Sequence, residues 1–142
     1  MIDLFQNYLR LGKVKKKTPD LIEAKSLLER ALGRVAYTKQ TEITEKTAPF
    51  VLEDAYEAIR EAAQALMSAE GFKPYSHEAT ISFVKEFHGS IFNEEDLFRF
   101  DRFRQLRHDS VYKAVQIRTE DAIASVLFAE PFIAKVKTIL KF

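Results

Sequence analysis

Apolar side chains recur every three to four residues along most of this chain, which is the spacing of amphipathic helices rather than of strands. Short polar or glycine-containing stretches interrupt the pattern and divide the chain into separate helices. We expect these helices over residues 2–10, 18–38, 47–70, 76–87, 93–112 and 119–140. Because short connections favour antiparallel neighbours, the predicted fold class is all-α. It is an antiparallel helical bundle of four to five long helices plus a short N-terminal helix, forming one domain over residues 1–142.

Capping residues mark the predicted helix boundaries. A hydroxyl followed by an early proline, or a single polar cap, begins four of the helices: Thr18-Pro19, Thr47-Ala48-Pro49, Ser76 and Asn93. Gly71 suits the C-terminal end of the third helix, and Gly71 to Tyr75 form a tight connection. The basic run from Lys13 to Lys17 is predicted to be a solvated loop rather than a dedicated phosphate site.

The composition narrows the class of protein. Hydrophobic residues make up 46% of the chain and charged residues 30%, with only 4 glycines and 4 prolines, which suits a helical globular domain. A formal net charge of +1 gives no general sign of nucleic-acid binding, and the lack of cysteine excludes disulfides and cysteine-ligated zinc. Because we find no signal-peptide pattern and no apolar run of membrane-spanning length, we expect a cytoplasmic protein without membrane contact.

One helix breaks its own amphipathic pattern. On a helical wheel, the apolar residues of the 93–112 helix share one broad face: Leu97, Phe100, Phe103 and Leu106. Arg104 and Arg107 lie near the middle of that face, and His108 follows Arg104 by one turn on the same side. Charged groups on a burying face cost several kcal/mol unless they are paired, so the two arginines need an explanation.

Two kinds of explanation remain open at this point. In the structural one, the arginines extend to the edge of the bundle or pair with nearby carboxylates, such as Glu78, Glu86 or Asp101. In the functional one, they line a basic pocket that opens to a second subunit or to a phosphate-bearing ligand. Guanidinium groups match phosphate geometry, and histidine exchanges protons near neutral pH. The gathering of arginines, His108, Asp109 and Tyr112 in one short segment favours the functional explanation.

The segment from Leu106 to Tyr112 (LRHDSVY) resembles the signature of HEPN domains, which is an arginine, usually followed by a polar residue, and then a histidine after a spacing of about four to six residues. The segments Ala55 to Ala62 and Gly71 to Phe83 resemble the helices that precede this signature in prokaryotic HEPN proteins. The resemblance implies a four- or five-helix bundle that forms a homodimer through the motif helix. It also implies a nucleotidyltransferase-like partner of the toxin–antitoxin type, and either metal-free RNA cleavage or binding without catalysis.

The match to the signature is incomplete. Arg107 fits the motif arginine and His108 the polar residue after it, which puts Tyr112 at the histidine position. The other alignment joins Arg102 to His108, but on a regular helix these two residues lie about 120° apart. We therefore prefer the Arg107 alignment, in which the catalytic candidates are Arg107, His108 and Tyr112 and the RNA- or nucleotide-binding candidates are Arg104, Arg107, His108 and Asp109.

These residues define the expected function and its alternatives. The first expectation is an RNA- or nucleotide-binding or assembly module with a degenerate Arg-His motif. The second is a metal-independent endoribonuclease, in which the arginines would stabilise the developing phosphorane charge and His108 would act as acid or base. The third is a structural subunit without a ligand. The chain has only 3 histidines, at spacings that match no compact metal motif, and no phosphate-binding glycine loop, so we expect neither a metal nor a cofactor.

Overall fold

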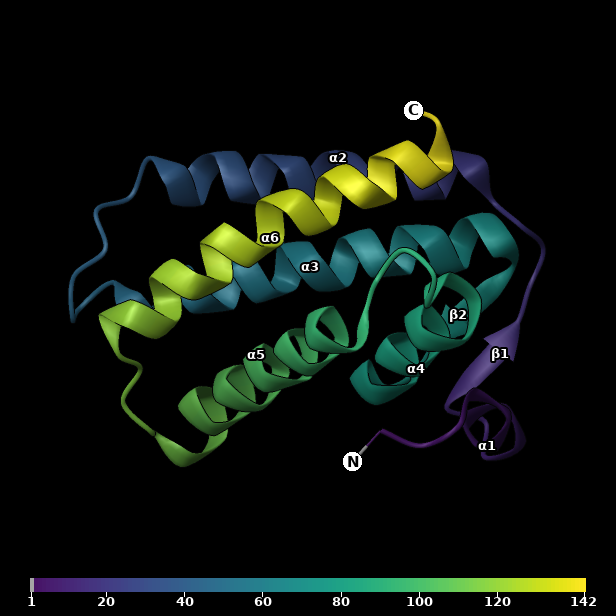
Figure 1. The fold of residues 1–142 in the computed structure, drawn as a ribbon, viewed down its shortest axis with the longest axis horizontal. Helices are drawn as coiled ribbons and strands as arrows, with labels where there is room; N and C mark the ends of the chain where they lie inside the picture. Colours follow the sequence, from purple (N-terminus) through teal and green to yellow (C-terminus); the bar gives the residue numbers. More distant parts are fainter. Residues whose placement is uncertain (1) are drawn as a thin grey trace.

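The computed structural model describes residues 2–142 and contains six helices and one two-stranded ribbon (Figure 1). The helices are α1 (Phe5–Arg10), α2 (Leu21–Lys39), α3 (Ala48–Glu70), α4 (His77–His88), α5 (Glu94–Lys113) and α6 (Thr119–Leu140). The strands are β1 (Val14–Lys16) and β2 (Phe72–Pro74). Five long helices and a short first helix confirm the predicted all-α bundle.

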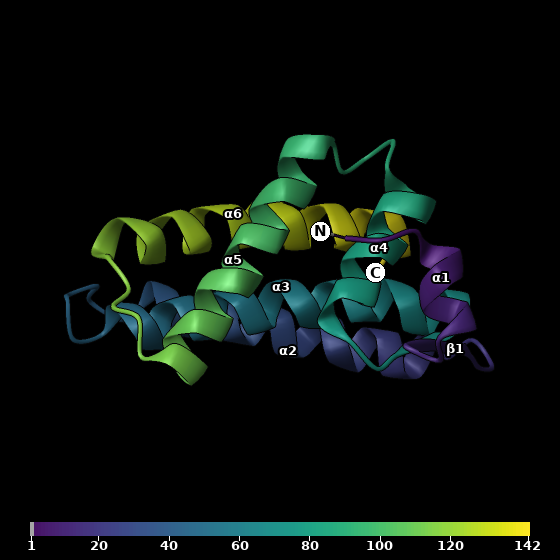
Figure 2. The ribbon, with the colours of Figure 1, turned by 90° about the horizontal axis from the view of Figure 1, so that it is seen from below.

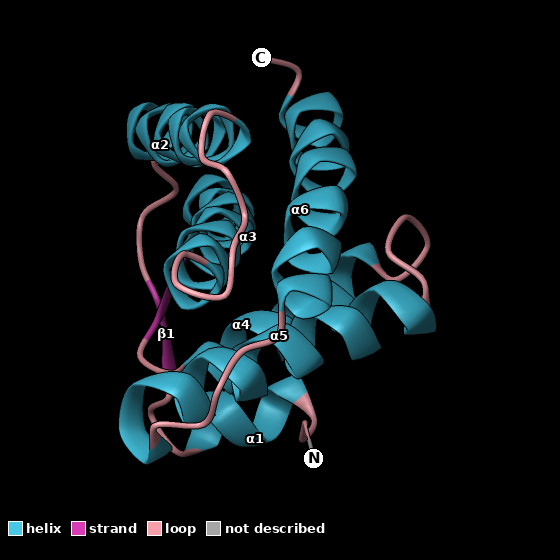
Figure 3. Cartoon of the chain, turned by 90° about the vertical axis from the view of Figure 1, so that its left-hand side faces the viewer, coloured by secondary structure: helices cyan, strands magenta, loops and turns pink. Residues whose placement is uncertain are grey.

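Helix α3 is the centre of the bundle. Figure 3 shows α2 and α3 side by side with α6 next to them, while α1, α4 and α5 cover the other side. The buried surface of α3 is rich in alanine: Ala55, Ala58, Ala62, Ala63 and Ala65 are fully buried. These small side chains allow neighbouring helices to approach α3 closely, so that α3 packs extensively against both α2 and α6.

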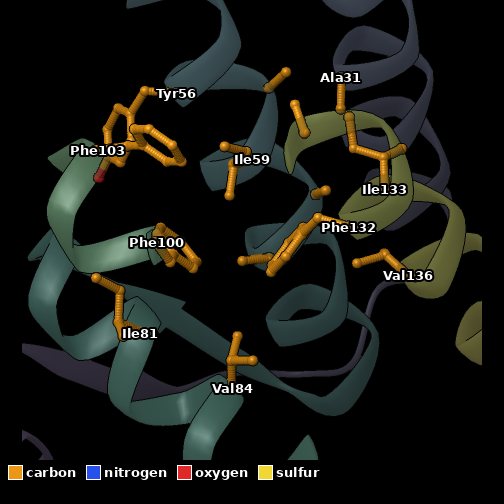
Figure 4. Close-up of a cluster of buried hydrophobic side chains, with 14 of the residues drawn as sticks. Ala31, Tyr56, Ile59, Ile81, Val84, Phe100, Phe103, Phe132, Ile133 and Val136 are labelled. Carbon is orange, nitrogen blue, oxygen red and sulfur yellow. The ribbon is translucent and has the colours of Figure 1, made fainter. Parts of the chain in front are cut away.

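Aromatic side chains join α5 to this centre. The ring of Phe100 lies 6.2 Å from that of Tyr56 on α3 and 5.5 Å from that of Phe132 on α6, as measured between centroids (Figure 4). Phe103 contacts Phe128 of α6 at 5.7 Å. Phe100 and Phe103 are the two buried residues of α5, which runs obliquely across α3 and α6 (Figure 2). Two aromatic anchors therefore set the orientation of this helix.

Most of the predicted helix boundaries are confirmed. The hydroxyl of Ser76 accepts a hydrogen bond from the backbone N–H of Ala79 at 3.0 Å, and Asn93 forms a capping box with Asp96. Gly71 ends α3 with φ 89°, in the left-handed region that favours glycine. A Cβ at Gly71 would also lie 2.8 Å from the carbonyl oxygen of Lys17, so this position requires glycine for two reasons.

The predicted start of the second helix is wrong. It begins at Leu21 rather than Thr18, and its cap is Asp20, whose carboxylate accepts from the N–H of Glu23 at 2.9 Å. The helix begins three residues later than predicted because the preceding backbone is hydrogen-bonded to the end of α3. The N–H of Asp20 donates to the carbonyl of Ser68 at 2.9 Å, and Pro19 packs against Gly71.

The predicted solvated loop at Lys13 to Lys17 is also wrong, since residues 14–16 form strand β1. This strand pairs antiparallel with β2 in the register Val14↔Pro74, Lys15↔Lys73 and Lys16↔Phe72. The side chain of Val14 is buried, which anchors the strand on the bundle. The ribbon lies next to α1, at the end of the molecule opposite the α5–α6 connection (Figures 1 and 2).

Candidate functional site

The two arginines on the inner face of α5 have different surroundings. The Nε of Arg104 donates to Oδ1 of Asp101 at 2.8 Å, and its Nη1 lies 3.9 Å from Oε1 of Glu78 on α4. These are two of the three carboxylates that the structural explanation offered. The positive charge of Arg104 is thus balanced within the chain, and its half-buried side chain holds α5 against α4.

Arg107 has no such partner. Among residues 2–142, no carboxylate oxygen lies within 4.0 Å of its guanidinium, and its Nε is the one buried side-chain polar atom without a hydrogen-bond acceptor. The side chain lines a hollow of about 360 Å³ between α2, α3 and α5. An unpaired buried donor costs about 1–3 kcal/mol, and no acceptor among the described residues offsets this cost at Arg107.

The other residues around this hollow are mostly charged. They are Arg34 from α2 and Phe50, Glu53, Asp54 and Glu57 from α3. Arg34 is committed to Glu61 and Asp54, its Nη1 lying 3.2 Å from the Asp54 carboxylate. Glu53 forms no ion pair among the described residues. The hollow, from here on the Arg107 hollow, therefore presents one free guanidinium and one free carboxylate to a ligand.

Glu57 is balanced by Arg60 on the same helix. The Nη2 of Arg60 donates to Oε2 of Glu57 at 2.7 Å, and its Nε lies 3.2 Å from the same oxygen. Burial alone would raise the pKa of Glu57, but these hydrogen bonds and the charges of Arg60 and Arg107 outweigh it and lower that pKa. Glu57 consequently stays ionised beside Arg107 at neutral pH.

A hydrogen-bonded pair of buried Tyr56 and half-buried His77 lies beside these charges. The Tyr56 hydroxyl and the His77 Nδ1 are 2.7 Å apart, and their rings stack with centroids 5.7 Å apart. Burial and the positive charge of Arg60 lower the pKa of His77, although Glu57 opposes the shift. Burial raises the pKa of Tyr56. His77 is therefore a neutral imidazole at neutral pH and lies within a structural hydrogen bond.

This arrangement predicts a pH-dependent stability that His77 controls. An unfolded histidine takes up a proton near pH 6.5, whereas native His77 resists protonation until a lower pH. The free energy of unfolding should fall as the pH is lowered from about 7 to 5, with a slope of at most about 1.4 kcal/mol per pH unit from this group. Urea unfolding across this range measures the slope, and His77→Gln is expected to reduce it.

Tyr56→Phe is the matched control for that experiment. It removes the hydrogen bond but leaves the imidazole half-buried and near the positive charge of Arg60, so it should keep the slope while lowering the free energy of unfolding by about 1 kcal/mol. An unchanged slope in His77→Gln would show that the pH dependence arises elsewhere.

The remaining candidates on α5 do not line the Arg107 hollow. His108 is exposed, and its ring lies 4.8 Å from that of Tyr112, which is 68% exposed. Asp109 pairs with Lys113, at 3.4 Å, instead of with an arginine. Arg107, His108 and Tyr112 therefore do not converge on one pocket within a single chain.

Arg102, the arginine of the alternative alignment, is also turned away. Its Nη2 lies 3.6 Å from Oδ1 of Asp121 on α6, and its side chain is 48% exposed. Sequence reasoning overlooked Phe50, Glu53, Glu57 and Arg60. The spacing of Glu57 and Arg60, three residues apart on a helix, was a usable signal for their ion pair.

No protein-family model matches the chain, and no curated protein matches its sequence. None of the helices described over residues 2–142 is both long enough and apolar enough to cross a membrane.

Proposed function

We propose that this chain is a HEPN-like RNA- or nucleotide-binding or assembly module, and that Arg107 holds an anionic group of the ligand. The observation that carries the proposal is the unpaired, partly buried guanidinium of Arg107 at the wall of a hollow. A phosphate offers the planar guanidinium two acceptors at once. The neighbouring Arg104, held by Asp101 and Glu78, acts as a structural residue in this proposal.

A nucleotide suits the Arg107 hollow better than a bare phosphate does. The free carboxylate of Glu53 would repel an isolated anion, but it accepts hydrogen bonds from ribose hydroxyls or from base amino groups. Phe50, whose side chain is 67% exposed, offers a surface on which a base stacks. A bound nucleotide would place its phosphate on Arg107, hydrogen-bond Glu53 through its sugar or base, and stack its base on Phe50.

Arg107→Ala tests this proposal directly. The variant is expected to weaken ATP binding by about 10- to 100-fold, because it removes a charge-assisted hydrogen bond worth about 1.5–3 kcal/mol. Isothermal titration calorimetry measures the affinity, with inorganic phosphate expected to bind more weakly than ATP. Arg99→Ala is the matched control, since Arg99 lies on the same helix, is 52% exposed and pairs with Glu95.

Two results would contradict the proposal. One is an Arg107→Ala variant that binds ATP as tightly as the parent protein. The other is a parent protein that stays strictly monomeric in sedimentation and binds neither nucleotide, RNA nor a nucleotidyltransferase-like partner. The exposed side chains of His108 and Tyr112 on α5 support the homodimer contact that the assembly role requires.

Metal-free RNA cleavage is the second candidate. It is favoured by the exposed His108–Tyr112 pair, in which the imidazole is accessible to a substrate. Within one chain this pair and Arg107 face different sides, so a composite site would need the partner protomer of a homodimer. Incubating the protein with RNA and a chelator tests for metal-free cleavage. Cleavage that persists in His108→Ala would exclude His108 as the acid or base.

A further inference from the structure

The β1–β2 ribbon collects lysines that are distant in the sequence. Lys15 is paired with Lys73 in the antiparallel register, and the backbone N–H of Tyr75 donates to the carbonyl of Lys13 at 2.8 Å. Alternate residues of a strand point to the same side, so Lys13, Lys15, Lys73 and Tyr75 share one face of the ribbon. All four residues are exposed. We call this set the lysine ribbon.

The positive charges of the lysine ribbon are not balanced within the chain. No carboxylate oxygen of the described residues lies within 4.0 Å of the ammonium groups of Lys13, Lys15 or Lys73. Lysine side chains directly opposite each other on paired strands destabilise a sheet. The adjoining Lys17 differs, because its ammonium group bonds to Glu23 and Ser68. Three unpaired lysine ammonium groups therefore lie close together, and their mutual repulsion does not stabilise the fold.

An aromatic ring lies close to two of these cations. The Nζ of Lys15 lies 5.2 Å from the ring centroid of Tyr75, and the Nζ of Lys73 lies 5.5 Å from it. The side chain of Tyr75 remains 53% exposed. Ammonium groups bind phosphates without demanding a fixed geometry, and an exposed aromatic ring stacks on any base. An acidic peptide would use the charges but would leave the ring without a stacked base.

We propose that the lysine ribbon is a binding surface for the phosphodiester backbone of single-stranded nucleic acid, with one base stacked on Tyr75. The interaction is independent of base sequence, since neither lysine nor the tyrosine ring reads base edges. The ribbon and the C-terminal part of α5 lie at opposite ends of the molecule (Figures 1 and 2). The surface is therefore separate from the Arg107 hollow and does not depend on the function proposed for it.

The test measures the affinity of a short fluorescent oligouridylate by anisotropy as the salt concentration is varied. Three phosphate contacts on a single strand predict a log–log slope of about −2, so affinity should fall about tenfold between about 50 and 150 mM salt. The combined variant Lys13→Gln, Lys15→Gln and Lys73→Gln should lose at least about tenfold in affinity and nearly all of that slope.

The control removes the same charge from elsewhere. Lys25, Lys46 and Lys137 are exposed and unpaired among the described residues, and they lie on α2, before α3 and on α6. Replacing these three with glutamine should change the affinity less than about threefold, because their charges act on the strand only through screened long-range attraction. Equal losses in both triple variants would overturn the proposal.

Substitutions at Tyr75 separate stacking from charge. Tyr75→Ala should weaken binding by about fivefold or more, whereas Tyr75→Phe should bind as the parent does. Equal binding by Tyr75→Ala and the parent, or preference for phosphatidylserine vesicles over the oligouridylate, would overturn the proposal. The Arg107 hollow is tested by ATP binding in Arg107→Ala, and the lysine ribbon is tested by oligouridylate binding in the triple lysine variant, so a failure at the one site is distinguishable from a failure at the other.

Discussion

Phe100→Ala is expected to lower the free energy of unfolding by about 3–5 kcal/mol, as measured by urea denaturation. The side chain of Phe100 is fully buried and packs between Tyr56 of α3 and Phe132 of α6 (Figure 4). Truncation removes its transfer free energy and leaves a cavity that the rigid rings around it cannot fill. Since α5 has only one other buried side chain, Phe103, amide exchange should accelerate more in α5 than in α3.

Phe98→Ala is the matched control on the same helix. The side chain of Phe98 is 68% exposed, so its truncation should change the free energy of unfolding by no more than about 0.5 kcal/mol. A loss below about 1 kcal/mol in Phe100→Ala would mean that α5 is not anchored by this ring.

The helices could be predicted from the sequence because their signals are local. Apolar spacing and caps such as Ser76 and Asn93 act within a few residues, and both caps are confirmed. The ribbon could not be predicted in this way. Its strands have 3 residues each, too few for a period-two pattern to emerge, and they pair across the whole of α2 and α3. The same long-range bonding moved the start of α2 from Thr18 to Leu21.

The candidate site was only partly accessible from the sequence for a similar reason. The wheel singled out Arg104 and Arg107 as a pair, because both interrupt one apolar face. Their difference depends on which helices pack opposite them: Arg104 meets Glu78 of α4, whereas Arg107 meets a hollow whose nearest acidic groups are mostly paired. A single-helix pattern holds no information about such neighbours.

Arg34→Met is expected to lower the free energy of unfolding by about 3 kcal/mol, because it leaves a buried carboxylate short of its partner. That carboxylate belongs to Glu61 on α3, which is 2% exposed. The Nε of Arg34 donates to Oε1 of Glu61, and the Nε of Arg30 lies 3.0 Å from Oε2. Arg30 is 67% exposed, so Arg30→Met should cost no more than about 1 kcal/mol and serves as the control.

The double variant Arg34→Met with Glu61→Met shows whether the ion pair itself stabilises the fold. Breaking one partner leaves an uncompensated charge, whereas replacing both with apolar side chains of similar volume removes the cost of burying that charge. The double variant is therefore expected to be more stable than Arg34→Met alone, and a double-mutant cycle gives the coupling free energy. Additive losses would contradict the direct contact between Arg34 and Glu61. Retention of ATP binding by the double variant would mean that Arg34 stabilises the contact between α2 and α3 and is not needed for the ligand. The ligand would then depend on Arg107, the arginine of the hollow that forms no ion pair among the described residues.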